Sequence, residues 1–153
     1  MGNYEFDKID LKLISILQDD ARTPFLEIAR RLDVSGGTIH VRLAKLEEAG
    51  VIDGYTLKVN EKRVGLDVCC LVGVTLKSTS EYQNVLKQLK KMKEVVDAWY
   101  TTGSYSLMLR VYSESMETFH LFLLNKLQSI KEIQSTETFV VMNSPISRSV
   151  EVS

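Results

Sequence analysis

Apolar residues up to about position 52 recur at helical spacing, so the first part of the chain is predicted to be helical. Asp7 or Asp10 can cap the first of these helices, and the polar run at 18–23 ends it. Its apolar stripe consists of Ile9, Leu13, Ile16 and Leu17.

Two further helices are predicted before Gly50. Thr23 and Pro24 are typical of a helix start, with Thr23 as the N-cap and Pro24 in the first helical position. The residues of this helix that we expect to face inward are Leu26, Ile28, Ala29 and Leu32. After a short break, Ser35 can cap a third helix that stops at Gly50, a residue suited to a left-handed C-cap.

From residue 51 the hydrophobic pattern changes to a mixture of strands and helices. Strands are predicted at 70–76, 95–101, 105–112 and 133–142, and helices at 82–89 and 116–127. The residues expected to share one face of the third strand are Tyr105, Leu107, Leu109 and Val111. The order β-α-β-β-α-β is the ferredoxin-like pattern, in which an antiparallel sheet carries two helices on one face.

The second and third helices, between about Pro24 and Ala49, have the lengths of a helix-turn-helix. At about 100° per residue, one face of the third helix points to the core and consists of Ile39, Leu43 and Leu46. The residues expected to read the major groove lie on the opposite face and are Thr38, Val41 and Lys45, with His40 and Arg42 on the flanks.

Several features of this region favour contact with DNA. Val41 is an exposed β-branched residue that a thymine methyl group would give an apolar partner. Gly36 and Gly37 begin the third helix without side chains, so their amides can approach a phosphate closely. Residues 22–45 hold five basic and two acidic residues, a local charge of +3 in a chain of net charge −1. A plain three-helix subdomain with a solvated basic face is the alternative interpretation.

The composition is that of a soluble globular protein, with 44% hydrophobic and 25% charged residues in a chain of 153. Because no apolar run reaches the roughly 18 to 20 residues that span a bilayer, and the first residues lack a signal-peptide pattern, we expect a cytoplasmic protein. The only two cysteines, Cys69 and Cys70, would point to opposite faces of a strand. We therefore expect two buried thiols and neither a disulfide nor a metal site.

Two segments of the second half are too polar for a packed core. One is a turn formed by Tyr100, Thr101, Thr102, Gly103, Ser104 and Tyr105; the other is a strand segment formed by Gln134, Ser135, Thr136, Glu137 and Thr138. Such compact groups suit a small zwitterion, with amides around Gly103 for its carboxylate and Glu137, or a carbonyl, for its ammonium. The remaining hydroxyl and amide groups can pair with a neutral amide side chain. Exposure of a sheet edge is the alternative explanation.

The third helix resembles the recognition helix of the Lrp/AsnC family of bacterial transcription regulators in the run Val34-Ser35-Gly36-Gly37-Thr38-Ile39-His40-Val41-Arg42, followed by Leu46-Glu47 and Ala49-Gly50-Val51-Ile52. Residues 7–17 and 21–22 resemble that family's first helix and the entry to its second. Gly36 stands where members typically carry proline. The resemblance covers the whole chain and implies an α+β protein: a winged-type helix-turn-helix domain at 1–52, a linker at 53–65, and a ferredoxin-like effector-binding and oligomerisation domain at 66–153.

The resemblance also implies partners. Members of the family bind double-stranded DNA and an amino acid, the latter between subunits of an octamer assembled from dimers. Residues 100–106 and 133–138 resemble the corresponding segments of the asparagine-responsive member, so L-asparagine is our first choice of effector, and no other cofactor is implied. The helix at 116–127 is apolar nearly all round, and we expect a second subunit to bury part of it, with His120 as an interface histidine.

Two other functions remain open at this stage. A DNA-organising protein of the same fold, indifferent to ligand, would share the helix-turn-helix and leave the polar turn and strand without a role. Sirohaem decarboxylases share the two-part architecture, but they are expected to use histidines near a tetrapyrrole, and this chain has two histidines, one of them on the recognition helix. The sequence shows no metal-ligand cluster, nucleophile-base pair or phosphate loop, so no catalytic residue is predicted.

Overall fold

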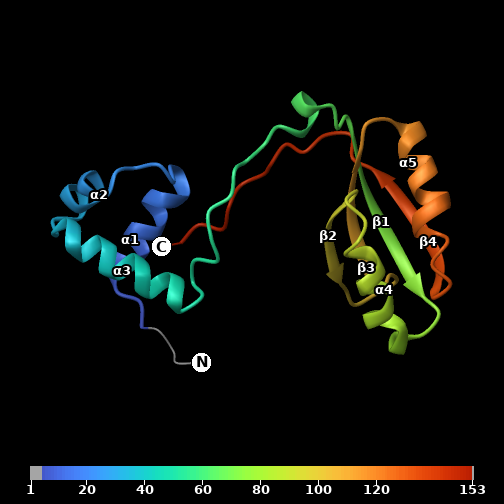
Figure 1. Ribbon diagram of the computed structural model, residues 1–153, viewed down its shortest axis with the longest axis horizontal. Coiled ribbons are helices and arrows are strands. Elements are labelled where there is room, and N and C mark those ends of the chain that lie inside the picture. The colour runs from blue at the N-terminus through green and yellow to red at the C-terminus, as the bar shows by residue number, and fades with distance from the viewer. Residues whose placement is uncertain (1–4, 153) are drawn as a thin grey trace. The chain divides into compact units, whose positions relative to one another are not determined.

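The computed structural model describes residues 5–152 (Figure 1). These residues form two compact units, one of residues 5–58 and 146–152 and the other of residues 59–145. This division cuts the predicted linker at 53–65 between residues 58 and 59. Residues 146–152 were expected in the second domain, but they group with the first unit, where Val152 packs against the helical core. Within the described residues, no helix is both long enough and apolar enough to cross a membrane.

The first unit is built on three helices, α1 (Lys8–Asp19), α2 (Phe25–Leu32) and α3 (Gly36–Glu48). Their shared core contains Leu13, Ile14, Leu17, Ile28, Ala29, Ile39, Leu43 and Leu46, so the predicted core face of α3 is confirmed. The predicted caps are also confirmed. Asp7 accepts hydrogen bonds from the amides of Ile9 and Asp10, Ser35 accepts one from Thr38, and Gly50 has a left-handed φ of 69°.

Two details of the predicted second helix are wrong. The N-cap is Pro24, and Thr23 is buried with its hydroxyl donating to the Asp20 carbonyl at 2.8 Å. Leu26 is 79% exposed, because it lies about 200° around the helix from Ile28. Phe25 packs against the core in its place.

The second unit contains the elements β1 (Val68–Leu76), α4 (Tyr82–Leu89), β2 (Val95–Tyr100), β3 (Leu107–Ser113), α5 (Met116–Phe122) and β4 (Ile133–Val140), with α5 continuing into a π turn, η3 (Leu123–Leu127). All neighbouring strands are antiparallel, in the order β2-β3-β1-β4, which confirms the ferredoxin-like prediction. The helices cover one face of the sheet (Figure 1). The core on that face includes Val72, Val74, Leu109 and Val111 from the strands and Val85, Leu89, Phe119 and Leu127 from the helices.

The opposite, open face of the sheet is formed by the alternate residues of each strand. Trp99 and Phe139 remain 46% and 44% exposed. Cys69 lies on this face and is only half-buried, so the expectation of two buried thiols holds for Cys70 alone. Tyr105 was expected on the helix-covered face, but it lies outside β3 and its ring covers Gly73 on the open face.

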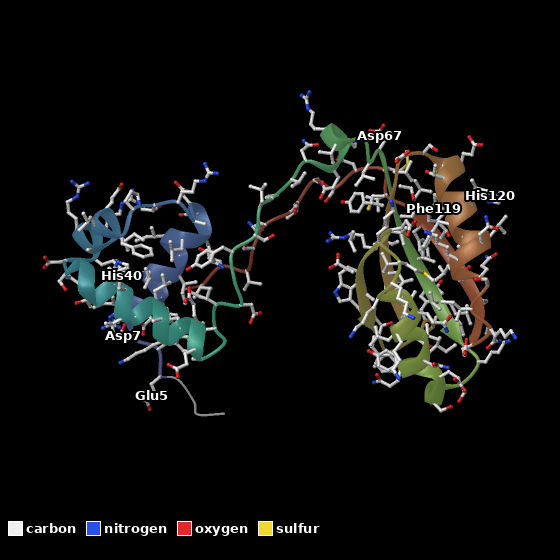
Figure 2. All side chains as sticks on the ribbon, in the orientation of Figure 1. Glu5, Asp7, His40, Asp67, Phe119 and His120 are labelled. Carbon is white, nitrogen blue, oxygen red and sulfur yellow. The ribbon has the colours of Figure 1, made fainter. Side chains whose placement is uncertain are left out.

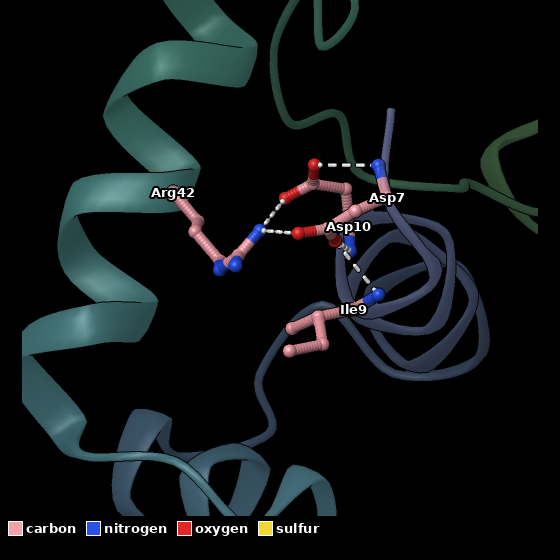
Figure 3. Close-up of polar contacts among 4 residues, drawn as sticks. All are labelled: Asp7, Ile9, Asp10 and Arg42. Carbon is pink, nitrogen blue, oxygen red and sulfur yellow. Dashed lines mark hydrogen bonds and ion pairs between the residues drawn. The ribbon is translucent and has the colours of Figure 1, made fainter. Parts of the chain in front are cut away.

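One ion-pair cluster joins α3 to the start of α1. A single guanidinium nitrogen of Arg42, Nη1, donates to Asp7 at 2.6 Å and to Asp10 at 2.8 Å (Figure 3). The Asp10 side chain is only 2% exposed, so the positive charge of Arg42 offsets part of the cost of burying its carboxylate. The Asp7 carboxylate also caps α1, and therefore the recognition helix is fastened to the cap of another helix.

Replacing Arg42 should destabilise the first unit much more than replacing a surface arginine. Arg42→Met removes the cation that pairs with the buried Asp10 carboxylate, and we expect a loss of about 2–4 kcal/mol in the free energy of unfolding. Arg31→Met is the matched control, because Arg31 pairs with Glu27 on the exposed surface of α2, and its loss should be below about 1 kcal/mol. Urea denaturation measures both; equal losses would contradict the structural role of Arg42.

The cap of α1 should also make the first unit sensitive to acid. The Asp10 backbone amide, and then the Arg42 guanidinium, hold the pKa of the Asp7 carboxyl below its usual 3.8. The pKa of Asp7 is lower in the folded than in the unfolded chain. The stabilisation that the ionised Asp7 carboxylate gives the folded state is therefore complete above the unfolded-state pKa, and it is lost as pH falls through the folded-state pKa. The free energy of unfolding should therefore fall more steeply below about pH 4 in the wild type than in Asp7→Asn. Asp19→Asn, at the other end of α1, should keep the wild-type slope; a slope unchanged in Asp7→Asn would refute this assignment.

Candidate DNA-binding surface and effector site

The turn before α3 sets the angle at which this helix leaves α2. Asp33 adopts a left-handed conformation with φ 56°, and the Val34 amide donates to the Ala29 carbonyl at 3.0 Å. The side-chain oxygens of Ser35 and Thr38 lie 2.8 Å apart, which ties the cap to the first turn of α3. The two helices therefore meet through a short, hydrogen-bonded turn, as a helix-turn-helix requires.

Most of the predicted reading face of α3 is accessible. His40, Val41 and Lys45 are exposed, and Val41 keeps 56% of its surface. Thr38 is half-buried, and Gly36 and Gly37 lie in the first turn. The His40 ring, labelled in Figure 2, meets the Phe25 ring edge-on, with ring centroids 4.6 Å apart.

Arg42 differs from the other predicted DNA contacts. Its guanidinium is held by Asp7 and Asp10, so we leave it out of the proposed reading face. Arg31 is likewise paired, with Glu27. Of the five basic residues at 22–45, all of them described, Arg22, Arg30 and Lys45 are in no ion pair with another described residue, so these three supply the positive charge that the segment can offer to phosphate groups.

The polar turn of the second unit folds across the end of β1. The Ser106 amide donates to the Val74 carbonyl at 2.8 Å, and the Ser106 hydroxyl accepts from the Leu76 amide at 3.2 Å. The Thr101 hydroxyl donates to the Tyr105 carbonyl at 2.8 Å. These bonds fix both ends of the turn, while Thr102, Gly103 and Ser104 between them are exposed and Gly103 has a φ of 113°.

Tyr105 and Glu137 meet over Gly73. A Cβ at Gly73 would lie 2.7 Å from the Tyr105 ring, so only glycine leaves room for this ring. Glu137 lies opposite Gly73 on β4, and its carboxylate accepts a hydrogen bond from the Tyr105 hydroxyl. That hydrogen bond raises the pKa of the Tyr105 phenol, which therefore keeps its proton and stays a donor.

The eleven predicted effector residues are not gathered in one place. Ser135 and Glu137 pair with Thr75 and Gly73 on the open face, whereas Thr136 and Thr138 pair with Val74 and Val72 on the helix-covered face. The Thr136 hydroxyl already accepts from Gln128 at 3.1 Å, and Gln134 is exposed at the start of β4. The structure thus brings Tyr105, Glu137 and Ser135 to one face and separates them from Thr136 and Thr138.

Tyr100 is the most remote of the predicted effector residues. It ends β2, and its ring lies 4.6 Å from that of Tyr82 on α4. Since β3 and β1 separate β2 from β4, about 14 Å of sheet lies between Tyr100 and the polar segment of β4. A single small amino acid cannot reach both edges within one subunit.

Three residues to which the sequence analysis gave no role in these surfaces, Gly73, Ser106 and Leu26, help to shape them. Gly73 could have been found, because a glycine inside an apolar strand often marks a close approach by another group. Ser106 and Leu26 carried no such signal. Ser106 anchors the turn, and Leu26 lies beside the start of α3, its Cδ2 atom 3.3 Å from where a Cβ of Gly36 would be.

A metal site and a packed histidine are two further features that could carry chemistry. The described part of the chain contains no group of three or more histidine, cysteine, aspartate or glutamate residues that could hold a metal ion. His120 is exposed on α5 (Figure 2) and is not packed within its own subunit. Whether a second subunit covers it stays a prediction.

Comparison with known proteins identifies both units. Residues 6–53 match the family described as winged helix-turn-helix DNA-binding, and residues 69–151 match the Lrp/AsnC ligand binding domain. The chain is 44% identical over 148 residues to the regulatory protein AsnC of Haemophilus influenzae, covering 97% of this chain and 99% of that protein. It is 42% identical over 151 residues to the regulatory protein AsnC of Escherichia coli (strain K12), covering 99% of each.

Solved structures agree with these relatives. The structure of Escherichia coli AsnC superimposes with a TM-score of 0.93 at 41% identity and covers 97% of this chain and 99% of that one. A transcriptional regulator from Neisseria meningitidis in complex with L-Met has the same fold, with a TM-score of 0.89 at 24% identity over 94% of each chain. These relatives are regulators, not enzymes, so the decarboxylase alternative is set aside. The chain belongs to the Lrp/AsnC family and is a DNA-binding transcription regulator with a ligand-binding domain.

Proposed function

We propose that this regulator responds to L-asparagine, bound against the open face of the sheet where two copies of the chain meet. The observation that carries the proposal is the Tyr105–Glu137 pair over Gly73, beside the exposed turn at 102–104. Glu137 offers a carboxylate to the ammonium group, and the amides around Gly103 offer donors to the carboxylate. The neighbouring hydroxyl groups suit the side-chain amide, and the AsnC name of the relatives supports this choice of ligand.

The proposed site is incomplete in one subunit. Glu137 and residues 102–104 are exposed, and β4 is an edge strand. Small-molecule sites usually bury about 70–90% of their ligand, which an open sheet edge cannot do alone. A second copy of the chain would supply the missing cover, and it would explain why the predicted effector residues lie on separated parts of the subunit.

Two exposed apolar surfaces support self-association. One is the open face of the sheet, where Trp99 and Phe139 are nearly half exposed. The other is the outer side of α5 and η3, where Met116, Leu121 and Leu124 are each about half exposed. Exposed apolar patches of this kind mark interaction sites. Two distinct patches on one unit allow a dimer to assemble further, in line with the predicted octamer.

The DNA-reading residues can be tested with DNA that the protein selects from a random duplex library. Lys45→Ala should weaken binding to every sequence and reduce the slope of log affinity against log salt by about 0.9, as expected for one lost phosphate contact. Val41→Ala should instead reduce the preference for one T·A pair and leave the salt slope unchanged. The control is Lys12→Ala, since Lys12 is exposed on α1. The face assignment is wrong if Lys45→Ala behaves like this control.

The effector can be identified by calorimetric titration of the full chain with each of the twenty amino acids. We expect L-asparagine to bind, and Glu137→Gln to lower its affinity at least about tenfold, because a charge-assisted hydrogen bond is lost. Glu117→Gln, an exposed glutamate on α5, should leave the affinity unchanged. Heat from no amino acid would favour the ligand-independent DNA organiser. Heat from leucine and not from asparagine would assign a different effector.

A further inference from the structure

Residues 146–152 return to the DNA-binding unit after the last strand of the ligand-binding domain. The Gln18 side-chain amide on α1 donates to the Val150 carbonyl at 3.1 Å. Val152 is half-buried and packs against the core of the three helices, whereas the Val150 side chain is 82% exposed. The match to the ligand-binding family extends to residue 151, so the end of that match lies within the first unit.

The chain therefore passes between the two units twice, at 58–59 and at 145–146. In the first connection, Ile52 packs on the helical core and β1 begins sixteen residues later at Val68, a span of at most about 55 Å. In the second, the Val141 amide donates to the Cys69 carbonyl at 2.9 Å, and the Val150 carbonyl accepts from Gln18 nine residues later, a span of at most about 30 Å. Pro145 restricts the backbone of the second connection further. The second connection is thus the tighter constraint.

The second connection begins at the strand that carries part of the proposed effector site. Glu137 lies on β4, which ends at Val140. The next residue, Val141, is the one whose amide donates to the Cys69 carbonyl. Val150, which is hydrogen-bonded to α1, lies only ten residues after the end of β4 at Val140, so a displacement of β4 can be passed to α1 along this short segment. Helix α1 is in turn fastened to the recognition helix by the Asp7–Arg42 and Asp10–Arg42 ion pairs.

We propose that residues 146–152 form a latch that fastens β4 to helix α1, and that this latch transmits effector binding to the DNA-binding unit. The transmitting role rests on the proposed asparagine response; the docking of the latch does not. Gln18 and Val152 are then positioning residues, which touch neither ligand nor DNA. With the latch open, the protein still binds both, but each binding event has less influence on the other.

The test compares Val152→Asp with its matched control Val150→Asp in the full chain. Both place the same charge on the same segment, but only Val152 packs against the helical core. Hydrogen exchange of the α1 amides should accelerate about fivefold in Val152→Asp, as expected when a half-buried valine side chain loses its contacts, and should be unchanged in Val150→Asp. Gln18→Ala should change exchange in the same direction by a smaller factor. Equal exchange in the two valine variants would overturn the docking.

The transmitting role has its own readout. In Val152→Asp, the factor by which asparagine changes DNA affinity should fall towards one, while calorimetric asparagine affinity and ligand-free DNA affinity stay near wild type. A full asparagine response in this variant would overturn transmission through the latch. If the wild-type protein binds no asparagine, the proposed function fails and the transmitting role fails with it, whereas the exchange comparison still decides whether the latch is docked.

Discussion

The ligand-binding unit is governed by a sheet that its own helices cover on one face only. Helices α4 and α5 bury the side of the sheet that holds Val72 and Leu109, and the other side keeps Trp99 and Phe139 partly in water. This asymmetry leaves edge strand β4 and the Tyr105–Glu137 pair accessible. This combination of an open apolar face and an open polar group is the reason we propose that a second copy of the same chain covers both.

In the DNA-binding unit the constraint is the small size of the core, because three short helices bury few side chains that could fix the recognition helix. Arg42 compensates by joining α3 to two carboxylates at the start of α1. A residue on the flank of the recognition helix therefore fixes that helix, and we propose that exposed neighbours such as Val41 and Lys45 make the DNA contacts. If residues 146–152 hold the same α1 from its other end, one helix links the recognition helix to the ligand-binding unit.

Local features of both units were predictable from the sequence, and long-range contacts were not. Caps at Asp7 and Ser35 and the core face of α3 follow from spacing within a few residues. The partners of Arg42 lie 32 and 35 residues away, and no local pattern indicates them. By its position Tyr105 should share a face with Leu107 and Leu109. It precedes the start of β3 at Leu107, however, and its ring lies over Gly73 on the opposite face of the sheet. Residues 146–152 carry no helical or strand pattern, so their return to α1 was not predictable.

We propose that an amino acid bound to the sheet changes the affinity of the helix-turn-helix for DNA. The most direct measurement titrates L-asparagine while recording both the DNA affinity and the molecular mass of the wild-type protein. Asparagine should change the affinity for a selected DNA site by at least about fivefold, with an accompanying change in molecular mass. A DNA affinity and mass that stay constant at saturating asparagine would contradict it.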